Sequence, residues 1–183
     1  MSSSPSDERV IVVDADDRAV GNAKKLFVHQ RNIRHRAISV LIFDRAGRML
    51  LQRRSASKYH SGGLWSNACC SHPRPGESSA AAADRRLREE MGFTTSLSFA
   101  CRFRYEAAVG VGLWENEVVH VFSGFHDGEV MPNADEAEDY RWQAVDDIWE
   151  DVKARPARYT PWFRLYSQAS WFAVRQQTVE ERC

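Results

Sequence analysis

Cysteine, an excess of charge of one sign and long apolar runs are all scarce or absent in this sequence. It has 4 cysteines in 183 residues, and its polar N-terminus, MSSSPSDERV, lacks the apolar core of a secretory signal peptide, so we expect reduced thiols in a cytoplasmic protein. No run reaches the roughly 18 apolar residues of a membrane-spanning helix, so we expect no membrane association. The 25 basic side chains are matched by 25 acidic ones, which argues against a general nucleic-acid-binding protein.

The apolar content is nevertheless sufficient for a folded core. Hydrophobic residues make up 43% and aromatic residues 11% of the chain, which excludes a wholly disordered protein. The length is that of one domain. We therefore expect a flexible tail over residues 1–8, a single domain over residues 9–178 and a short tail over residues 179–183, with a monomer as the default oligomeric state.

Strand and helix patterns alternate along the chain. The turn at residues 44–47 ends in glycine and separates two apolar runs, which predicts a hairpin. Thr160 and Pro161 are typical of a helix start, and we expect Gly21 and Asn22 to end the first strand. The expected strands are 9–14, 37–43, 48–52, 65–71, 98–107, 115–125 and 140–145, and the expected helices are 77–91, 145–154 and 160–177. This interleaving predicts a compact α/β (α+β) domain with a mixed sheet flanked by helices.

The helix expected over residues 77–91 has informative spacing. Its sequence, ESSAAAADRRLREEM, is rich in helix formers, and Gly92 follows it as a typical stop signal. Glu90 lies four residues after Arg86, and Glu89 lies four residues after Arg85, so each pair shares one face of the helix. Taken alone, these pairs indicate solvent-exposed ion pairs.

The same segment resembles the Nudix family, whose motif reads G-x5-E-x7-R-E-hydrophobic-x-E-E-x-G-hydrophobic. Ser71 stands where the motif has its first glycine, and Arg86 stands where it has its first helical glutamate. The positions that match in register are Glu77, Arg85, Leu87, Glu89, Glu90, Gly92 and Phe93. The resemblance implies a Nudix-like fold and a helix whose carboxylates bind Mg²⁺ with a diphosphate. Arginine in place of a carboxylate weakens a hydrolase interpretation and keeps a diphosphate-binding one.

Two strand segments carry further polar groups. If residues 65–71 form a strand, Cys70 and His72 point to one face and Cys69 to the other. Likewise, Glu115 and Glu117 share one face of the strand at 115–125. Singly these signals are weak, because a lone cysteine is usually a small buried apolar residue and alternating charges usually mark a solvated strand face.

Together they resemble type I isopentenyl-diphosphate isomerases, a branch of the Nudix superfamily. The segment WSNACCSHP, residues 65–73, is similar to that family's W-T-N-x-C-x-H-P. The resemblance extends in the same order from about residue 9 to residue 175. It is carried by Lys25-x3-His29, His35-Arg-Ala, Leu51-Gln-Arg-Arg54-x3-Lys58, Phe103-Arg-Tyr105, Glu115-Asn-Glu117 and Pro161-Trp162.

The resemblance implies two metal sites. The first would be built from three imidazoles and two carboxylates, namely His29, His35, His72, Glu115 and Glu117. Such a nitrogen-rich set suits Mn²⁺ or Zn²⁺ better than Mg²⁺. The second would hold a Mg²⁺ that bridges diphosphate oxygens to Glu90 and to the backbone carbonyl of Cys70.

The resemblance also implies a reaction, the conversion of isopentenyl diphosphate to dimethylallyl diphosphate. The family adds a proton on one face of the alkene and removes one from the other, through a tertiary carbocation. Cys70, as a thiolate base, would serve one face, and Glu117 with Tyr105 would serve the other. Trp162 would stabilise the cation by a cation–π contact.

The basic residues that the resemblance assigns to the small-molecule diphosphate are Lys25, Arg54, Lys58 and Arg86. For His60, in the loop after Lys58, a position that reaches the site and a solvent-exposed loop position are both open, and we expect the exposed one. Two other interpretations stay open: a Nudix-type diphosphate hydrolase acting on a nucleotide-like substrate, in which Cys70 is dispensable, and a catalytically inactive module that binds a metal or ligand.

Overall fold

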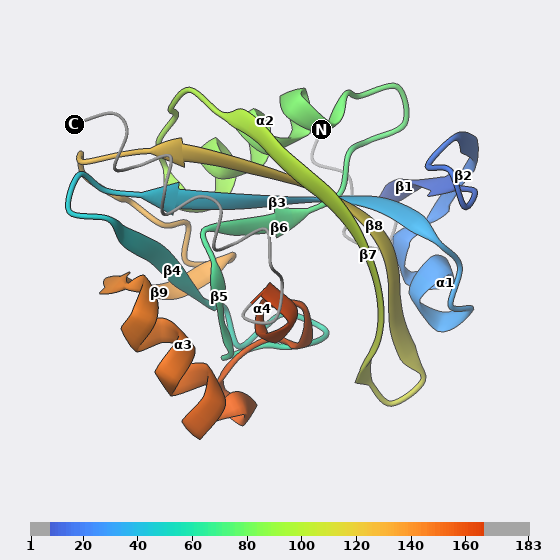
Figure 1. Cartoon of the computed structure of the whole chain (residues 1–183). Coiled ribbons are helices and arrows are strands. Elements are labelled where there is room, and N and C mark those ends of the chain that lie inside the picture. The colour runs from blue at the N-terminus through green and yellow to red at the C-terminus, as the bar shows by residue number, and fades with distance from the viewer. Residues whose placement is uncertain (1–7, 167–183) are drawn as a thin grey trace.

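The computed structural model describes residues 8–166, which form a mixed sheet with helices on both of its faces (Figure 1). In chain order the elements are β1 Arg9–Val13, β2 Ala19–Lys24, α1 Lys25–Gln30, β3 His35–Phe43, β4 Arg48–Arg54, β5 Trp65–Asn67, β6 Cys69–Ser71, α2 Ser79–Met91, β7 Ser98–Gly110, β8 Leu113–Phe125, β9 Ala137–Ala144, α3 Val145–Ala154, a short 3-10 helix Pro156–Arg158 and α4 Pro161–Tyr166. Among these described elements, no helix is both long and apolar enough to cross a membrane.

Strand β3 organises the sheet. It pairs in parallel with β8 over its whole length and antiparallel with β6, whereas β3 and β4 share one register pair, Phe43 with Met49, and then diverge. Strand β7 extends the sheet beyond β8, and β4 carries β5 and β9. The parallel register sets His35 directly opposite Glu117. Two residues far apart in sequence therefore meet at one end of the sheet.

Two apolar clusters cover the faces of the sheet. Ile38, Val40 and Ile42 of β3 pack with the apolar side of α2, including Leu87. Leu41 packs in the other cluster, which holds the buried residues of α3 and α4. Because both faces of β3 are covered, its sequence reads as a nearly continuous apolar run. These two layers confirm the predicted mixed-sheet domain with flanking helices.

Helix α2 has the ends that its sequence indicates, although it begins two residues later than expected. The Ser78 hydroxyl accepts a hydrogen bond from the Ala81 N–H at 3.1 Å, and Gly92 adopts a left-handed conformation with φ of 78°. Glu77 lies before the helix, where its carboxylate accepts hydrogen bonds from Arg85. A serine cap therefore defines the helix start.

One expectation about the N-terminal half is wrong, and one short helix was not predicted. Gly21 and Asn22 do not end the first strand but lie inside β2. The chain turns earlier, where the Asp14 carboxylate accepts hydrogen bonds from the backbone N–H groups of Asp16 and Arg18, a local side-chain turn. Helix α1, which carries His29, is also absent from the sequence prediction, because a helix of six residues has too little periodicity to detect.

The C-terminal half follows the prediction more closely. The expected strand at 65–71 is interrupted at Ala68 and forms β5 and β6. The hairpin strands β7 and β8 are both 13 residues long, longer than expected. The expected helix at 160–177 is described only as α4, and its remainder lies outside the described residues, as do residues 1–7 and 179–183.

Candidate active site

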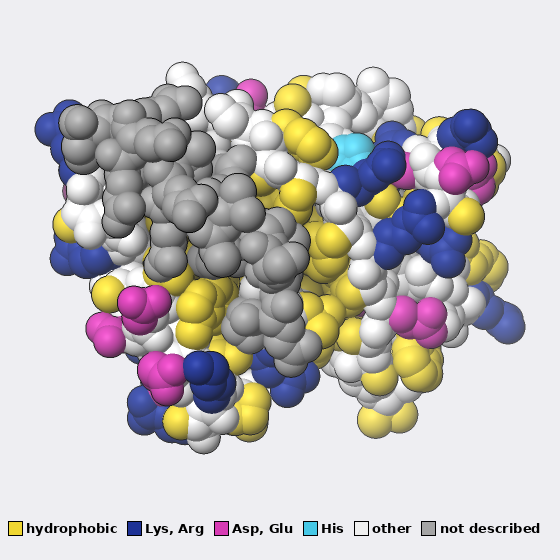
Figure 2. Space-filling view, in the orientation of Figure 1, with side chains coloured by type: hydrophobic (Ala, Val, Ile, Leu, Met, Phe, Trp, Pro, Cys, Tyr) yellow, Lys and Arg dark blue, Asp and Glu magenta, His cyan; other side chains and the backbone are white. Residues whose placement is uncertain are grey.

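A cavity of about 1030 Å³ opens between α1, α2, α4 and the ends of the central strands. Over the face of the molecule drawn in Figure 2, acidic and basic side chains are interspersed, as the zero net charge suggests. Three of the predicted site residues, His29, His35 and Glu90, are buried next to the cavity without lining it. The predicted site residues that do line it are Lys25, Arg54, Lys58, Cys70, His72, Arg86, Tyr105, Glu115, Glu117 and Trp162.

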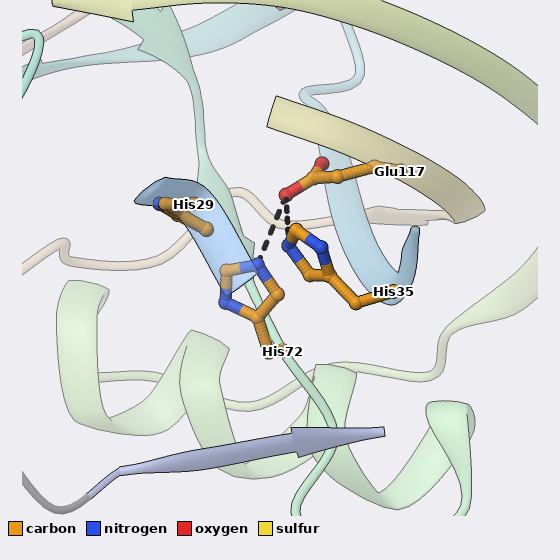
Figure 3. A group of neighbouring side chains, drawn as sticks. All are labelled: His29, His35, His72 and Glu117. Carbon is orange, nitrogen blue, oxygen red and sulfur yellow. Dashed lines mark hydrogen bonds and ion pairs between the residues drawn. The ribbon is translucent and has the colours of Figure 1, made fainter. Parts of the chain in front are cut away.

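Four of the predicted metal ligands converge at one point (Figure 3). His29, His35, His72 and Glu117 are buried, and one potential ligand atom from each lies within 4.8 Å of the others. Glu117 Oε1 is 2.9 Å from His72 Nε2 and 3.4 Å from His35 Nε2. Glu115, the fifth predicted ligand, is adjacent to this cluster and is not one of the four converging residues.

The hydrogen bonds of the imidazoles leave lone pairs free for a metal. His35 Nδ1 donates to the backbone oxygen of Ile33 at 2.8 Å, which leaves Nε2 unprotonated in the neutral ring. His29 Nδ1 is 2.9 Å from the Tyr59 hydroxyl. His29 Nε2 and His72 Nδ1 are buried and have no hydrogen-bond partner in the described part of the chain. Buried polar atoms are costly to leave unpaired, so this donor set fits a divalent metal ion.

The electrostatics of the cluster favour the neutral form of the His29 and His72 imidazoles. Burial, reinforced by the neighbouring His72 and His35, lowers the pKa of His29 to about 2, and burial lowers the pKa of His72 to about 4. Burial alone would raise the pKa of Glu117, but its close contacts with His35 and His72 outweigh burial, and the pKa lies well below its usual value. Neutral imidazoles with one ionised carboxylate are the protonation states that metal binding requires.

Tyr59 should strengthen metal binding by orienting the His29 ring. If His29 binds a metal through Nε2, its Nδ1 carries the proton and donates it to the Tyr59 oxygen, which orients the ring. We expect Tyr59→Phe to weaken Mn²⁺ binding by about 10- to 100-fold, the usual effect of losing such a partner. Calorimetric titration with Mn²⁺ measures this. Tyr140→Phe, at an exposed position on β9, is the matched control, and equal affinity in all three proteins would contradict the prediction.

A tyrosine joins the two strand carboxylates. The Tyr105 hydroxyl is placed to donate to Glu115 Oε2 at 2.6 Å and to Glu117 Oε2 at 2.8 Å. Burial and the negative charge of Glu115 raise the pKa of Tyr105 well above its usual value, so the phenol keeps its proton. Burial and the neighbouring Glu117 likewise raise the pKa of Glu115. Two adjacent carboxyl groups with opposite pKa shifts can hold and transfer a proton.

Cys70 lines the cavity, and its thiol is held in place by buried polar groups. The thiol donates to Asn67 Oδ1 at 3.0 Å, and its sulfur is 3.6 Å from Ser39 Oγ. Burial raises the pKa of Cys70 to about 12, so it is a neutral thiol before substrate binds. Cys69 points the other way and contacts Glu90 at 3.2 Å, which agrees with the predicted alternation of faces.

Helix α4 is linked to the same polar network. The Trp162 indole N–H donates to Ser66 Oγ at 2.9 Å, and Ser66 Oγ donates to Asn67 Oδ1 at 3.2 Å. The Tyr166 hydroxyl donates to Ser39 Oγ at 2.7 Å. The groups beside the Cys70 sulfur are thus held from two points on one helix.

The four basic residues predicted to bind diphosphate all line the cavity. Lys25 pairs with Glu8 at 3.0 Å. Arg54 is 9% exposed, its Nε has no partner among the described residues, and its guanidinium carbon lies 5.2 Å from the centre of the Trp162 ring. Lys58 pairs with a carboxylate that sequence analysis did not identify, Glu136. A buried guanidinium with an unpaired nitrogen at a cavity wall favours an anionic ligand.

The carboxylates of α2 are engaged by arginine. Arg86 Nη2 lies 2.9 Å from Glu90 Oε1 and 3.0 Å from Glu136 Oε1, and its Nη1 lies 2.7 Å from Glu89 Oε2. Glu90 Oε2 also accepts a hydrogen bond from Gln52 at 3.0 Å. Arginine at position 86 therefore occupies the acidic groups that a hydrolytic metal site on this helix would use.

The expectation for His60 is wrong, because its side chain is only 8% exposed. His60 Nε2 is 3.6 Å from Glu115 Oε1, and its ring meets the Trp162 ring edge-on at 6.0 Å. The loop folds inward at Gly62, where a Cβ would lie 2.8 Å from the Ala56 oxygen. The two adjacent glycines, Gly62 and Gly63, are the sequence signal that could have indicated this close approach.

Comparisons with known proteins identify one matching domain family and relatives that share about half of the sequence. Residues 33–163 match the NUDIX domain family. The chain is 53% identical over 156 residues to isopentenyl-diphosphate Delta-isomerase 2 of Aromatoleum aromaticum, covering 85% of this chain and 82% of that protein. It is 48% identical over 157 residues to the isopentenyl-diphosphate Delta-isomerase of Serratia proteamaculans, covering 86% and 88%.

Solved structures agree on the fold. A crystal structure of the protein DR0079 from Deinococcus radiodurans superposes with a TM-score of 0.74 at 16% identity, covering 88% of this chain and 98% of that one. A MutT protein from Methanosarcina mazei Go1 gives a TM-score of 0.61 at 22% identity, covering 74% and 91%. At these identities, the likeness concerns the fold alone.

Proposed function

The chain belongs to the isopentenyl-diphosphate Delta-isomerases of the NUDIX family, and we propose that its cavity is where that reaction takes place. It is an isomerase that converts isopentenyl diphosphate to dimethylallyl diphosphate. The observation that carries the assignment to this cavity is that Cys70, Tyr105 and Glu117 line one and the same space, next to a cluster of buried imidazoles. An isomerase that adds and removes protons needs such groups around a single substrate.

His29, His35, His72 and Glu117 would hold a divalent cation, and Glu115, which shares the Tyr105 hydroxyl with Glu117, would be the fifth ligand. The nitrogen-rich ligands favour Mn²⁺ or Zn²⁺. When bound, the cation would supply positive charge that orients the carboxylates and lowers their proton affinity. Glu90 and the Cys70 backbone carbonyl would hold a Mg²⁺ for the diphosphate, a role that rests on the family resemblance alone, because both Glu90 oxygens accept hydrogen bonds from protein groups.

Cys70 and the Tyr105 hydroxyl would act on the two faces of the alkene. Because the isomerisation is reversible, the group that gives a proton in one direction takes it back in the other. Tyr105 contacts both Glu115 and Glu117, so a proton can move between the phenol and a carboxylate without leaving the site. Ser39 and Asn67 would hold the Cys70 sulfur in place as it gains or loses its proton.

The cavity walls would bind the diphosphate and protect the cation. Lys25, Arg54, Lys58 and Arg86 supply the positive charge for the diphosphate. Trp162 lines the cavity, and the Arg54 guanidinium lies over the face of its ring, so the ring can interact with positive charge. A carbocation beside that face would gain about 2 kcal/mol in a water-poor site.

The proposal is tested by following isopentenyl diphosphate with proton NMR in D₂O, with the protein and Mg²⁺ or Mn²⁺. We expect dimethylallyl diphosphate that carries deuterium in a methyl group, because the added proton comes from groups that exchange with solvent. Release of phosphate from an unchanged alkene would show a hydrolase instead. An unchanged substrate with every divalent metal would reject both activities.

We further propose that the protein acts as a cytoplasmic monomer on this small-molecule substrate, without a nucleic-acid or membrane partner. The balanced charge of the chain supports the absence of a nucleic-acid partner.

A further inference from the structure

Glu136 lies between two of the basic side chains that line the cavity. Its Oε1 is 3.0 Å from Arg86 Nη2, and its Oε2 accepts a hydrogen bond from Lys58 Nζ. Lys58 follows β4, whereas Arg86 belongs to α2. The Glu136 side chain itself is 19% exposed. One carboxylate therefore joins two segments that are far apart in the sequence and meet at the predicted diphosphate site.

The main chain holds Glu136 to the same two segments. Its carbonyl oxygen accepts from the Ser55 N–H at 2.9 Å, three residues before Lys58. Its N–H donates to the Asn133 oxygen at 2.8 Å, and the Asn133 N–H in turn donates to the Glu90 oxygen at the end of α2 at 2.9 Å. The backbone position of the carboxylate is thus set without the two cations.

The two cations depend on Glu136 to different degrees. Arg86 also contacts Glu89 and Glu90, so it would keep its direction without Glu136. For Lys58, Glu136 is the carboxylate partner that the described residues provide. A lysine ammonium sits on a flexible four-carbon chain, and holding it in one place costs rotamer entropy. Lys58 should therefore be the side chain that Glu136 fixes.

We propose that Glu136 is a positioning residue that holds Lys58 beside Arg86, ready for the diphosphate of the substrate. The inference rests on the proposed function, which assigns both cations to the diphosphate. A carboxylate can also compete with an anion for the same cations, and the two roles predict opposite effects on binding. Positioning is favoured because the main chain fixes the backbone of Glu136 and its two carboxylate oxygens contact one cation each.

Glu136→Gln separates these roles, because glutamine keeps the shape and removes the charge. The probe is inorganic pyrophosphate with Mg²⁺, titrated calorimetrically into the full chain. We expect the Kd to rise about tenfold. The KM for isopentenyl diphosphate should rise by a similar factor, with kcat within about twofold, the signature of lost ground-state binding. Glu138→Gln is the matched control, because Glu138 forms a partly exposed pair with Arg53, and it should change neither value.

A double-mutant cycle tests whether Glu136 acts through Lys58. In a Lys58→Ala background, Glu136→Gln should weaken pyrophosphate binding by less than about threefold, because the side chain it positions is gone. A merely structural role would give the same loss in both backgrounds. The cycle also keeps the inference testable if Glu136→Gln lowers thermal stability.

Three results would overturn the inference: unchanged pyrophosphate affinity, tighter binding, or a lower kcat with an unchanged KM. These are distinguishable from failure of the proposed function. A wild-type chain that isomerises its substrate while Glu136→Gln has no effect on binding overturns the inference alone. A chain that binds Mg²⁺-pyrophosphate in a Glu136-dependent way but does not isomerise overturns the function alone.

Discussion

Replacing Cys70 with alanine is expected to lower kcat by about a thousandfold, within the range that general acid–base groups contribute. Cys70 lines the cavity, and its thiol has a defined direction set by Asn67 and Ser39. The alanine side chain can neither donate nor accept a proton. Pyrophosphate binding should stay within about threefold of wild type, because the cations are untouched. Proton NMR of the isomerisation in D₂O measures the rate.

The chain offers a matched thiol for comparison. Cys101 lies on β7 and packs beside the apolar cluster of α3 and α4. Cys101→Ala should retain isomerase activity within about threefold, since it removes a thiol without removing a group from the cavity. A Cys70→Ala protein with more than a tenth of wild-type activity would show that the thiol is not a proton-transfer group, whatever the control does.

Replacing Glu117 with glutamine is expected to cause two losses at once. The carboxylate contacts both His72 and His35, and its second oxygen accepts from Tyr105. Glutamine removes the charge from the metal cluster and the proton acceptor from the phenol. We expect a fall in kcat of at least about a thousandfold and Mn²⁺ binding weaker by at least tenfold, because a ligand is more important than its supporting partners.

Metal content after dialysis, measured by mass spectrometry, accompanies the NMR rate. Glu106→Gln is the control, because Glu106 lies on the exposed side of β7 and bonds Asn32. If the Glu117→Gln protein keeps its full metal content but loses activity, Glu117 is not a metal ligand, and its proton-transfer role stands. If the variant is fully active without retained metal, both roles are refuted.

The parts of the fold that were predicted correctly depend on local signals. The glycine at position 92 lies next to the helix that it ends, and the turn at residues 44–47 defines its own hairpin. The failure at Gly21 has the same origin, since a glycine-containing pair that resembles a turn was given more weight than the side-chain turn that Asp14 makes. The correct predictions and the wrong strand end at Gly21 therefore both depend on interactions between residues close in sequence.

The site was predicted through its resemblance to a family, and periodicity contributed little. Cys70 and His72 were placed on one face by strand alternation, and the structure agrees, because both line the cavity. Spacing could not show that His35 would lie opposite Glu117, since that depends on a parallel pairing between distant strands. For the same reason Glu136 was missed, and His60 was expected to be exposed although it is buried. Each lies in an irregular segment whose direction depends on tertiary contacts.

The parallel pairing of β3 with β8 has a kinetic consequence. His35 and Glu117 become neighbours only when these two strands, separated by the whole middle of the chain, have found their register. Closing so long a loop is slow compared with forming a helix or a hairpin. A metal ion bound by both residues would stabilise the paired strands only after they have met. Because this contact forms late in folding, it would slow unfolding more than it speeds folding, and the metal-bound protein should have a low unfolding rate.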